Sequence, residues 1–272
     1  MYVILSCIQP KYIISMNWLT QRESLYKVWT ARHSKSKFIV MQHGAYVGGI
    51  VTDIPHKYTK CDIFLTWGPF FVEQFTFYNT SKKVKIVNFG NSIYNQFNRT
   101  NFSYKEQISK KVLLVPTALD NININILYTL INRLKELYFE VEVKAHAYQG
   151  RSTVGIEYPN FHGVTLVKGQ LYEILQKSDY EFVISDHSSS LLDAIFFKNK
   201  VLYFDPNNNS KGYRTNYSNY LINLHDKDFV NIERDDFFDL INIENQEALF
   251  ANMITCGNNE IDSRLLFTKQ GQ

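Results

Sequence analysis

This chain has few cysteines, no long apolar run and only a small net charge. Its three cysteines, Cys7, Cys61 and Cys256, are far apart and odd in number, which indicates neither a disulfide framework nor a metal site and fits a reducing compartment. No apolar run approaches the roughly 18 residues of a membrane span, and the N-terminus lacks a charged region followed by a long apolar one. We therefore expect a cytoplasmic protein, and peripheral attachment at the inner face of the cell membrane stays open.

The charge balance and the aromatic content further narrow the class of protein to which this chain could belong. The 29 Lys and Arg residues nearly match the 26 Asp and Glu residues, for a formal net charge of +3, and no dense basic tract occurs. This balance argues against a nucleic-acid partner. With 20 Phe and 18 Tyr in 272 residues, the chain can bury one large core or two modest ones.

Several familiar site motifs are also missing. The segment GAYVGG, residues 44–49, leaves the backbone free to approach a ligand, but it matches neither the P-loop nor the dinucleotide fingerprint. No serine lies in a nucleophile elbow, so a hydrolase triad is poorly supported. No two histidines share helical spacing or pair with a nearby cysteine. We therefore expect no metal site.

Apolar runs of strand length alternate with helical spacing through the first third of the chain. A polar stretch at residues 91–110, rich in Asn, Arg, Ser and Lys, ends this series and predicts a domain boundary at about residue 105. The expected strands are Tyr12–Ser15, Phe38–Met41, Ile63–Thr66 and Val84–Val87, and the expected helices are Gln21–Arg32 and one that begins at Pro69.

A second alternating series follows the polar stretch. Strands that alternate with helices imply parallel sheets with right-handed crossovers, so we expect two α/β lobes, 1–105 and 106–272, with a cleft between them. The expected strands are Lys111–Val115, Phe139–Lys144 and Val164–Val167, the expected helices are Ile122–Tyr138 and Tyr172–Lys177, and residues 182–204 form a strand–turn–helix–strand unit. The last 30 residues show helix-like patches and a polar tail.

The most informative segment is FVISDHSSSLLDAIFFKNKVLYF, residues 182–204. An apolar run ends in Ser185-Asp186, and the hydroxyls of Ser188, Ser189 and Ser190 follow where a helix should begin. Unpaired backbone N–H groups and the helix dipole favour an anion there, so this turn predicts a phosphate site. The alternative is that one serine merely caps the helix. Capping needs one such residue, whereas three are present.

Three histidines share one context, a strand end followed by a small residue. They lie in the turns Gln42-His43-Gly44, Lys144-Ala145-His146-Ala147 and Ser185-Asp186-His187-Ser188. Ligands of open parallel sheets bind at the carboxyl ends of the strands, so the three turns could converge on one cleft. A histidine there can act as a general base or donate a hydrogen bond to phosphate. Each could instead be a partly buried histidine that the backbone satisfies.

Five segments, in chain order, resemble the CDP-glycerol glycerophosphotransferase-like family: FIVMQHG, CDIFLTWG, LLVPTALD, VEVKAHA and ISDHSSSLLDAIFFKNKVLYFDP. The similarity covers about residues 37–217, and its last segment is the most specific. The family pattern has a His-Gly turn, a Pro-Thr, a Lys-Pro-His-Pro turn and an Asp-Tyr-Ser-Ser turn. Surface-polysaccharide glycosyltransferases that use CMP-activated acidic sugars share similar turns, so the resemblance identifies the superfamily more closely than the donor.

The resemblance implies an α/β fold of the GT-B type, with two Rossmann-like lobes, parallel sheets and a shortened N-terminal lobe. It implies an enzyme, a transferase that moves a sugar or polyol-phosphate unit from a CDP- or CMP-activated donor to a growing capsule, teichoic-acid-like or lipopolysaccharide polymer. The donor is a substrate, and no separate cofactor is expected. The partners are this donor and a polysaccharide or lipid-linked acceptor.

The resemblance also assigns roles to residues. His43 would be the general base that deprotonates the acceptor hydroxyl. The residues implied in donor-phosphate or nucleotide binding are Lys144, His146, Asp186, Ser188, Ser189 and Ser190, and Gln42, Gly44 and His187 are further candidates for the cleft.

The chain departs from the family pattern in three places. Both prolines of the second-lobe turn are missing around Lys144 and His146, His187 replaces the usual aromatic residue, and only 41 residues precede Gln42. A first sheet without its leading strands would expose an edge, which a homodimer could protect. Two other functions therefore stay open, a non-catalytic nucleotide-binding subunit of a polysaccharide assembly complex and a nucleotide-sugar epimerase.

Overall fold

The structure is a computed structural model, and it describes residues 1–16, 21–45, 61–79, 83–91, 93–104, 109–116, 124–144, 163–177, 179–186, 188–205, 217, 220–224 and 231–256. The chain folds into two compact units. The first comprises the described residues of Met1–Ala45, Ile50–Phe97 and Ala251–Gln272, and the second those of Asn98–Phe250. The division into lobes 1–105 and 106–272 stays a prediction.

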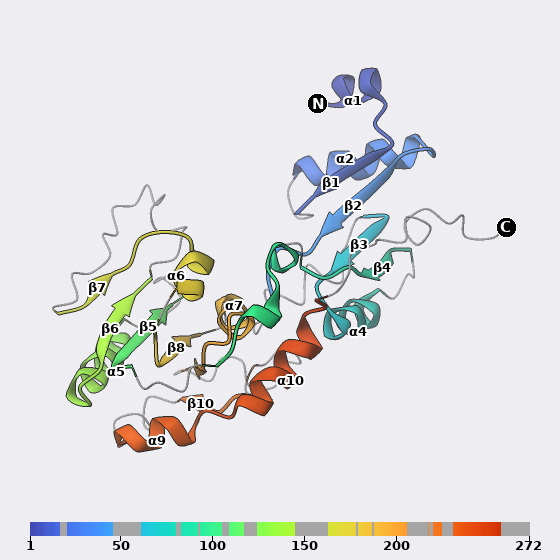
Figure 1. Cartoon of the computed structure of the whole chain (residues 1–272). Coiled ribbons are helices and arrows are strands. Elements are labelled where there is room, and N and C mark those ends of the chain that lie inside the picture. The colour runs from blue at the N-terminus through green and yellow to red at the C-terminus, as the bar shows by residue number, and fades with distance from the viewer. Residues whose placement is uncertain are drawn as a thin grey trace. The chain divides into compact units, whose positions relative to one another are not determined.

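The first unit is built on a parallel sheet (Figure 1). Its described strands follow the order β1-β2-β3-β4, so each crossover steps to the neighbouring strand in the same direction. Its elements are α1 (Tyr2–Ile8), β1 (Tyr12–Ser15), α2 (Gln21–Arg32), β2 (Lys37–Met41), β3 (Ile63–Thr66), α4 (Pro69–Tyr78), β4 (Lys85–Asn88) and the short 3-10 turn η1 (Tyr94–Gln96). The expected strands and helices are confirmed, and α1 is an addition that the sequence pattern did not predict.

The two faces of this first sheet are covered unequally. On one face, aromatic helix residues pack on the strands: Tyr26 contacts Phe38 edge-on at 5.7 Å between ring centroids, and Phe75 contacts Phe64 at 4.3 Å. On the other face a small cluster of buried residues contains Ile39, Ile63 and Leu65. Ile14, which pairs with Ile39 on this face, is 61% exposed.

A close backbone contact closes the first unit at the start of α4. Pro69 begins this helix, where its missing N–H costs nothing. The preceding Gly68 is extended, and a Cβ there would lie only 2.3 Å from the carbonyl oxygen of Met253. The amide of Thr255 donates a 2.7 Å hydrogen bond to the carbonyl of Trp67. Glycine is therefore required at position 68 because two backbone segments meet there.

The second unit has the larger described sheet, in the order β10-β9-β8-β5-β6-β7 with every pairing parallel. Its elements are η2 (Arg99–Asn101), β5 (Lys111–Val115), α5 (Ile124–Glu136), β6 (Glu140–Val143), β7 (Thr165–Leu166), α6 (Leu171–Lys177), β8 (Phe182–Ser185), α7 (Ser190–Phe196), β9 (Val201–Phe204), β10 (Asn223–Leu224), α9 (Arg234–Asp239) and α10 (Ile243–Met253). These confirm the expected alternation and the α/β class with two parallel sheets.

A continuous apolar core holds the second sheet. Phe182 on β8 stacks on Phe237 of α9 at 5.8 Å between centroids, and Phe139 meets Phe182 edge-on at 5.3 Å. The apolar residues of α5 at helical spacing, including Leu127 and Leu134, pack into the same cluster. This core fixes the strand ends that carry the polar turns.

Candidate functional site

The second sheet reverses its direction of growth between β5 and β8. From β5 the chain proceeds outward through β6 and β7, and then returns to pair β8 with the other side of β5 and continues to β9 and β10. The crevice outside the carboxyl ends of two such strands is the usual ligand site of open α/β sheets. Here it lies beside Val115 and Pro116 on one strand and Ser185 and Asp186 on the other.

A hydroxyl joins the two strands at this point. Ser185 Oγ donates a 2.5 Å hydrogen bond to the carbonyl of Val115 and lies 3.1 Å from Ser190 Oγ. Both serines are buried, at 2% and 4% exposure, so their hydroxyls serve the turn itself. A hollow of about 10 Å³ lined by Pro116, Ser185 and Asp186 lies beside this bond.

The next two hydroxyls are half-buried and lie at the start of α7. Ser188 Oγ accepts a 3.2 Å hydrogen bond from the amide of Ser190, and the hydroxyl of the buried Tyr217 donates to the Ser188 carbonyl at 3.0 Å. Ser189 is the N-cap residue with helical angles (φ −63°, ψ −12°), and its hydroxyl makes no capping hydrogen bond. The expected helix start is confirmed, and its three serines have different local roles.

Two more of the expected donor residues lie at the same edge of the sheet. Lys144 follows β6 directly, is half-buried and donates its amide to the carbonyl of Leu114 at 2.9 Å. Because β6 and β8 flank β5, Lys144 lies level with Ser185, roughly 10 Å away across two strand spacings, and Ser188 follows three residues later. Asp186 is buried beside the small hollow. His146 and His187 lie outside the described residues, and their roles stay predictions.

An acid at the end of β9 extends this edge, and no role was predicted for it. Asp205 is 2% exposed, and Tyr203 donates a 3.3 Å hydrogen bond to its carboxylate. Its amide donates to the side chain of Asn223 at 2.8 Å. The signal was present in the sequence, because an acid directly follows the apolar run VLYF.

The first unit carries its own polar strand end after β2. Gln42 is 2% exposed, and both polar atoms of its side chain are hydrogen-bonded to backbone. Its Nε2 donates to the carbonyl of Gly44 at 2.7 Å, and its Oε1 accepts from the amide of Trp67 at 2.9 Å. The Trp67 indole N–H also donates to the Gln42 carbonyl at 2.9 Å. Gln42 therefore fixes the turn that carries His43.

His43 lies in this turn with part of its surface open to solvent and part covered by protein. Loss of water around the ring lowers the pKa of His43 below its ordinary value of 6.5, and a hydrogen bond with the backbone of Met16 partly opposes this shift. A lowered pKa favours the neutral ring, the form that can accept a proton. A Cβ at the next residue, Gly44, would meet no atom of the described residues within 4 Å, so their packing does not require glycine there.

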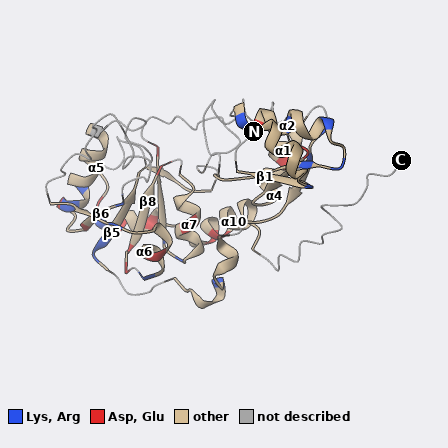
Figure 2. Cartoon of the chain, turned by 90° about the horizontal axis from the view of Figure 1, so that it is seen from above, with Lys and Arg blue, Asp and Glu red and all other residues tan. Residues whose placement is uncertain are grey.

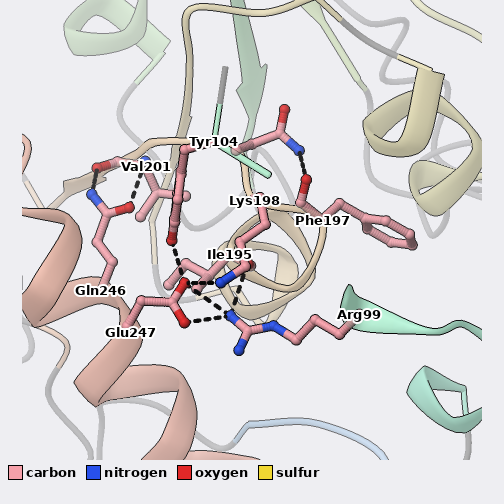
Figure 3. A network of polar contacts seen from close by, with 9 residues as sticks. Arg99, Tyr104, Ile195, Phe197, Lys198, Val201, Gln246 and Glu247 are labelled. Atoms are coloured by element: carbon pink, nitrogen blue, oxygen red, sulfur yellow. Dashed lines mark hydrogen bonds and ion pairs between the residues drawn. The ribbon is translucent and has the colours of Figure 1, made fainter. Parts of the chain in front are cut away.

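A second polar network lies elsewhere in the second unit (Figure 3). Glu247 on α10 accepts hydrogen bonds from Arg99 at 2.8 and 2.9 Å, from Lys198 at 2.9 Å and from the Tyr104 hydroxyl at 2.5 Å. Partial burial would raise the pKa of Glu247, but these donors and the charge of Arg99 outweigh it and lower the pKa. Burial and the bond to Glu247 raise the pKa of Tyr104. The network holds α10 to the segment 99–104 and to the end of α7.

A wider hollow of about 240 Å³ lies at the opposite edge of the second sheet, near the amino-terminal ends of β8 and β9. Its lining includes Tyr180, Glu181 and Asn199, all largely buried. Because these residues precede their strands, this hollow is separate from the serine turn. Among the described residues, no three His, Cys, Asp or Glu side chains could together hold a metal ion. Within the same residues no helix has both the length and the apolar character to cross a membrane.

No protein-family model matches this sequence, and no curated protein matches it. Solved structures do resemble the fold. S. aureus MnaA with UDP is 10% identical with a TM-score of 0.59, over 97% of this chain and 76% of that one. The H444N variant of the wall teichoic acid polymerase TagF is 15% identical with a TM-score of 0.52, over 94% and 71%. TarM is 14% identical with a TM-score of 0.53.

The chain spans only 51% of the pneumococcal O-GlcNAc transferase GtfA and 56% of TarM. At these low identities the likeness concerns the fold. The architecture is that of the GT-B class, with two α/β units that each contain a parallel sheet.

Proposed function

We propose that this protein is a GT-B-type transferase that moves a sugar or polyol-phosphate unit from a CDP- or CMP-activated donor to a growing cell-surface polymer. The observation that supports this most is the place of the serine turn, at the point where the second sheet reverses direction. Strand–helix turns at that point bind phosphate in many α/β proteins, whatever the reaction.

The donor would lie along the carboxyl edge of the second sheet. Ser188 and Ser189 offer hydroxyls, and Lys144 offers a positive charge on the other side of β5. Charge-assisted hydrogen bonds from such groups hold a diphosphate and stabilise negative charge on the departing nucleotide. The predicted set of donor residues also includes His146, His187, Asp186 and Ser190. Of these, we assign Ser190 to support of the turn, because its hydroxyl faces Ser185.

The acceptor would be activated by His43 in the first unit. Its lowered pKa favours the neutral imidazole, which would take the proton of an acceptor hydroxyl as that oxygen attacks the donor. Gln42 and Gly44 would hold the turn, with the Gln42 side chain bonded to backbone on both sides.

The solved structures that resemble this fold do not decide which nucleotide base the donor carries. The TagF structures include one soaked with CDPG, with a TM-score of 0.50, whereas MnaA is solved with UDP. The serine and histidine turns of the second unit favour the cytidine donor, since they resemble the CDP-glycerol family pattern and the start of α7 has serines and no glycine.

The function is tested by incubating the protein with CDP-glycerol, a CMP-activated acidic sugar or a UDP-hexose, with and without a lipid-linked glycan acceptor. Chromatography would follow release of CMP, CDP or UDP, and mass spectrometry would detect the extended acceptor. We expect acceptor-dependent release from a cytidine donor. His43→Ala should reduce turnover by about 10²–10⁴-fold while donor affinity stays nearly unchanged.

His33→Ala is the matched control, because it removes a histidine of the same unit that lies outside this turn. Thermal melts of both variants separate catalysis from folding. Loss of donor binding in step with loss of folding in His43→Ala would contradict the catalytic role. A free sugar product without acceptor extension would indicate an epimerase.

A non-catalytic nucleotide-binding subunit is the second candidate. The observation that favours it is the difference between the sheets, four described strands in the first unit against six in the second. Such a protein would bind cytidine nucleotides through the second unit and show no turnover with any donor and acceptor pair.

A further inference from the structure

The first unit exposes a group of large apolar side chains on α1. Val3, Ile4 and Ile8 are 74%, 57% and 68% exposed, and Met1 beside them is 52% exposed. The helix has no buried residue. So much apolar surface on one short helix indicates an interaction site.

The inner side of α1 is fixed on α2, so the outer side has a defined orientation. The Trp29 indole N–H donates to Ser6 Oγ at 3.3 Å, and Arg32 lies over the Tyr2 ring at 5.9 Å from the guanidinium carbon to the ring centroid. Leu25 and Val28, which are 43% and 46% exposed, lie two turns and one turn before Arg32 on the same side of α2. We call the exposed side chains of α1 together with Leu25 and Val28 the N-terminal apolar face.

Basic side chains surround this face. Residues 1–45 contain six Lys and Arg residues and a single acid, Glu23, whereas the whole chain carries a net charge of only +3. Glu23 is 6% exposed and accepts a hydrogen bond from Ser15, so it offers little negative charge to the surface. Figure 2 shows the blue Lys and Arg segments around α1, α2 and β1.

Three of these cations lie at the end of the sheet that α1 adjoins. Lys37 opens β2 and donates its amide to the carbonyl of Lys11, and Ser36 Oγ donates to the carbonyl of Pro10, two residues after α1. Lys11, Lys35 and Lys37 are all exposed. Arg32, held over Tyr2, adds a fourth cation at the other end of α1.

We propose that the N-terminal apolar face docks on the surface of an anionic lipid bilayer. A short helix with apolar side chains outward and cations around it suits the boundary between headgroups and acyl chains, where apolar burial and attraction to anionic lipid add together. A second copy of this chain fits less well, because two faces with the same surplus of positive charge would repel each other. The inference does not depend on the proposed transferase activity.

Sedimentation with vesicles tests the proposal. We expect the protein to bind vesicles made of equal parts of phosphatidylcholine and phosphatidylglycerol, and to bind pure phosphatidylcholine far more weakly. Raising the salt from about 0.1 M to about 1 M should weaken binding, because the Debye length falls from about 10 Å to about 3 Å. Binding that ignores lipid charge and salt would contradict the role of the cations.

Two pairs of variants separate the two contributions. Lys35→Gln with Lys37→Gln should lower the partition coefficient roughly five-fold for each cation removed. Ile4→Ser with Ile8→Ser should lower it at least about ten-fold for each side chain. The matched controls in the second unit are Lys168→Gln with Lys177→Gln and Leu166→Ser with Ile222→Ser, all exposed, and they should leave binding unchanged. Equal losses in variants and controls would overturn the assignment to this face.

The cysteines provide a direct contact measurement. Cys7 on α1 and Cys256 are exposed, while burial raises the pKa of the Cys61 thiol to about 12 and keeps it unreactive. An environment-sensitive fluorophore on Cys7, in a Cys256→Ser protein, should shift to the blue when anionic vesicles are added. The same fluorophore on Cys256, in a Cys7→Ser protein, should not. A Cys7 probe that is already blue-shifted without vesicles, together with a dimer in sedimentation velocity, would show that this face binds a second copy of the chain and not a bilayer.

Discussion

The two sheets share one architecture but differ in how completely they are buried. In the described part of the second unit, the cluster around β5, β6 and β8 contains fifteen buried residues, with Phe139, Phe182 and Phe237 in mutual contact. Among the described residues of the first unit, the cluster on the Ile39 face contains three buried residues, and Ile14 beside it is largely exposed. The second sheet can therefore position a site rigidly from its own core, whereas the first presents apolar and basic surface outward.

The largest expected effect is a difference between equivalent strand residues. Ile184→Ala should cost about 4–5 kcal/mol of unfolding free energy, because the cavity would lie among closely packed neighbours in the larger cluster. Ile39→Ala should cost about 2 kcal/mol, because the thinner cluster can collapse into the space. Urea unfolding followed by tyrosine and tryptophan fluorescence measures both. Equal costs would contradict the difference between the two cores.

The next effect sharpens the comparison within the first unit. Gly68→Ala should destabilise the protein by about 1–3 kcal/mol, because the new Cβ would lie 2.3 Å from the Met253 carbonyl oxygen and neither backbone can give way cheaply. Gly44→Ala should be nearly neutral, because no atom of the described residues lies within 4 Å of its Cβ. Differential scanning calorimetry of the two variants compares them, and a neutral Gly68→Ala would show that the end of α10 is not packed there.

A smaller effect concerns the network on α10. Glu247→Gln should cost about 1–2 kcal/mol at pH 7, since the carboxylate that is removed accepts bonds from Arg99, Lys198 and Tyr104 but remains 30% exposed. Folding lowers the pKa of Glu247, so its contribution is complete above the ordinary value of 4.5 and is lost as the pH falls through the folded value.

The gap in stability between Glu247→Gln and the natural protein should therefore close in acid. Chemical unfolding at several pH values between neutrality and acid measures it. A gap that stays constant over that range would show that the charge of Glu247 contributes nothing.

Local patterns predicted most of the fold. The strands Tyr12–Ser15, Ile63–Thr66 and Lys111–Val115 and the helix Gln21–Arg32 were predicted with the bounds that the structure has, because apolar spacing and flanking polar residues mark them. The helix α1 was not predicted, since YVILSCI is almost entirely apolar, with Ser6 its one hydroxyl besides Tyr2, and carries no capping signal.

The site was only partly predictable. Ser188 and Ser189 follow a strand directly, so their place at the start of α7 was evident. The sequence could not show that Ser190 would turn toward Ser185, or that Tyr217 would reach the Ser188 carbonyl, because such contacts depend on how distant segments pack. For the same reason, the use of the Gln42 side chain to hold Trp67 became visible only in the structure.

Calorimetric titration of CMP, CDP, UMP and UDP under one buffer tests most directly whether the second sheet carries a cytidine donor at its serine turn. We expect CDP to bind more tightly than UDP by about 1–3 kcal/mol, because a site paired to the cytosine amino group leaves polar groups unmatched with uracil. The double variant Ser188→Ala with Ser189→Ala should lose charge-assisted hydrogen bonds to the nucleotide worth about 1.5–3 kcal/mol each. Ser190→Ala should leave the affinity unchanged, because the Ser190 hydroxyl faces Ser185. Unchanged affinity in the double variant, or tighter binding of UDP than of CDP, would contradict this assignment.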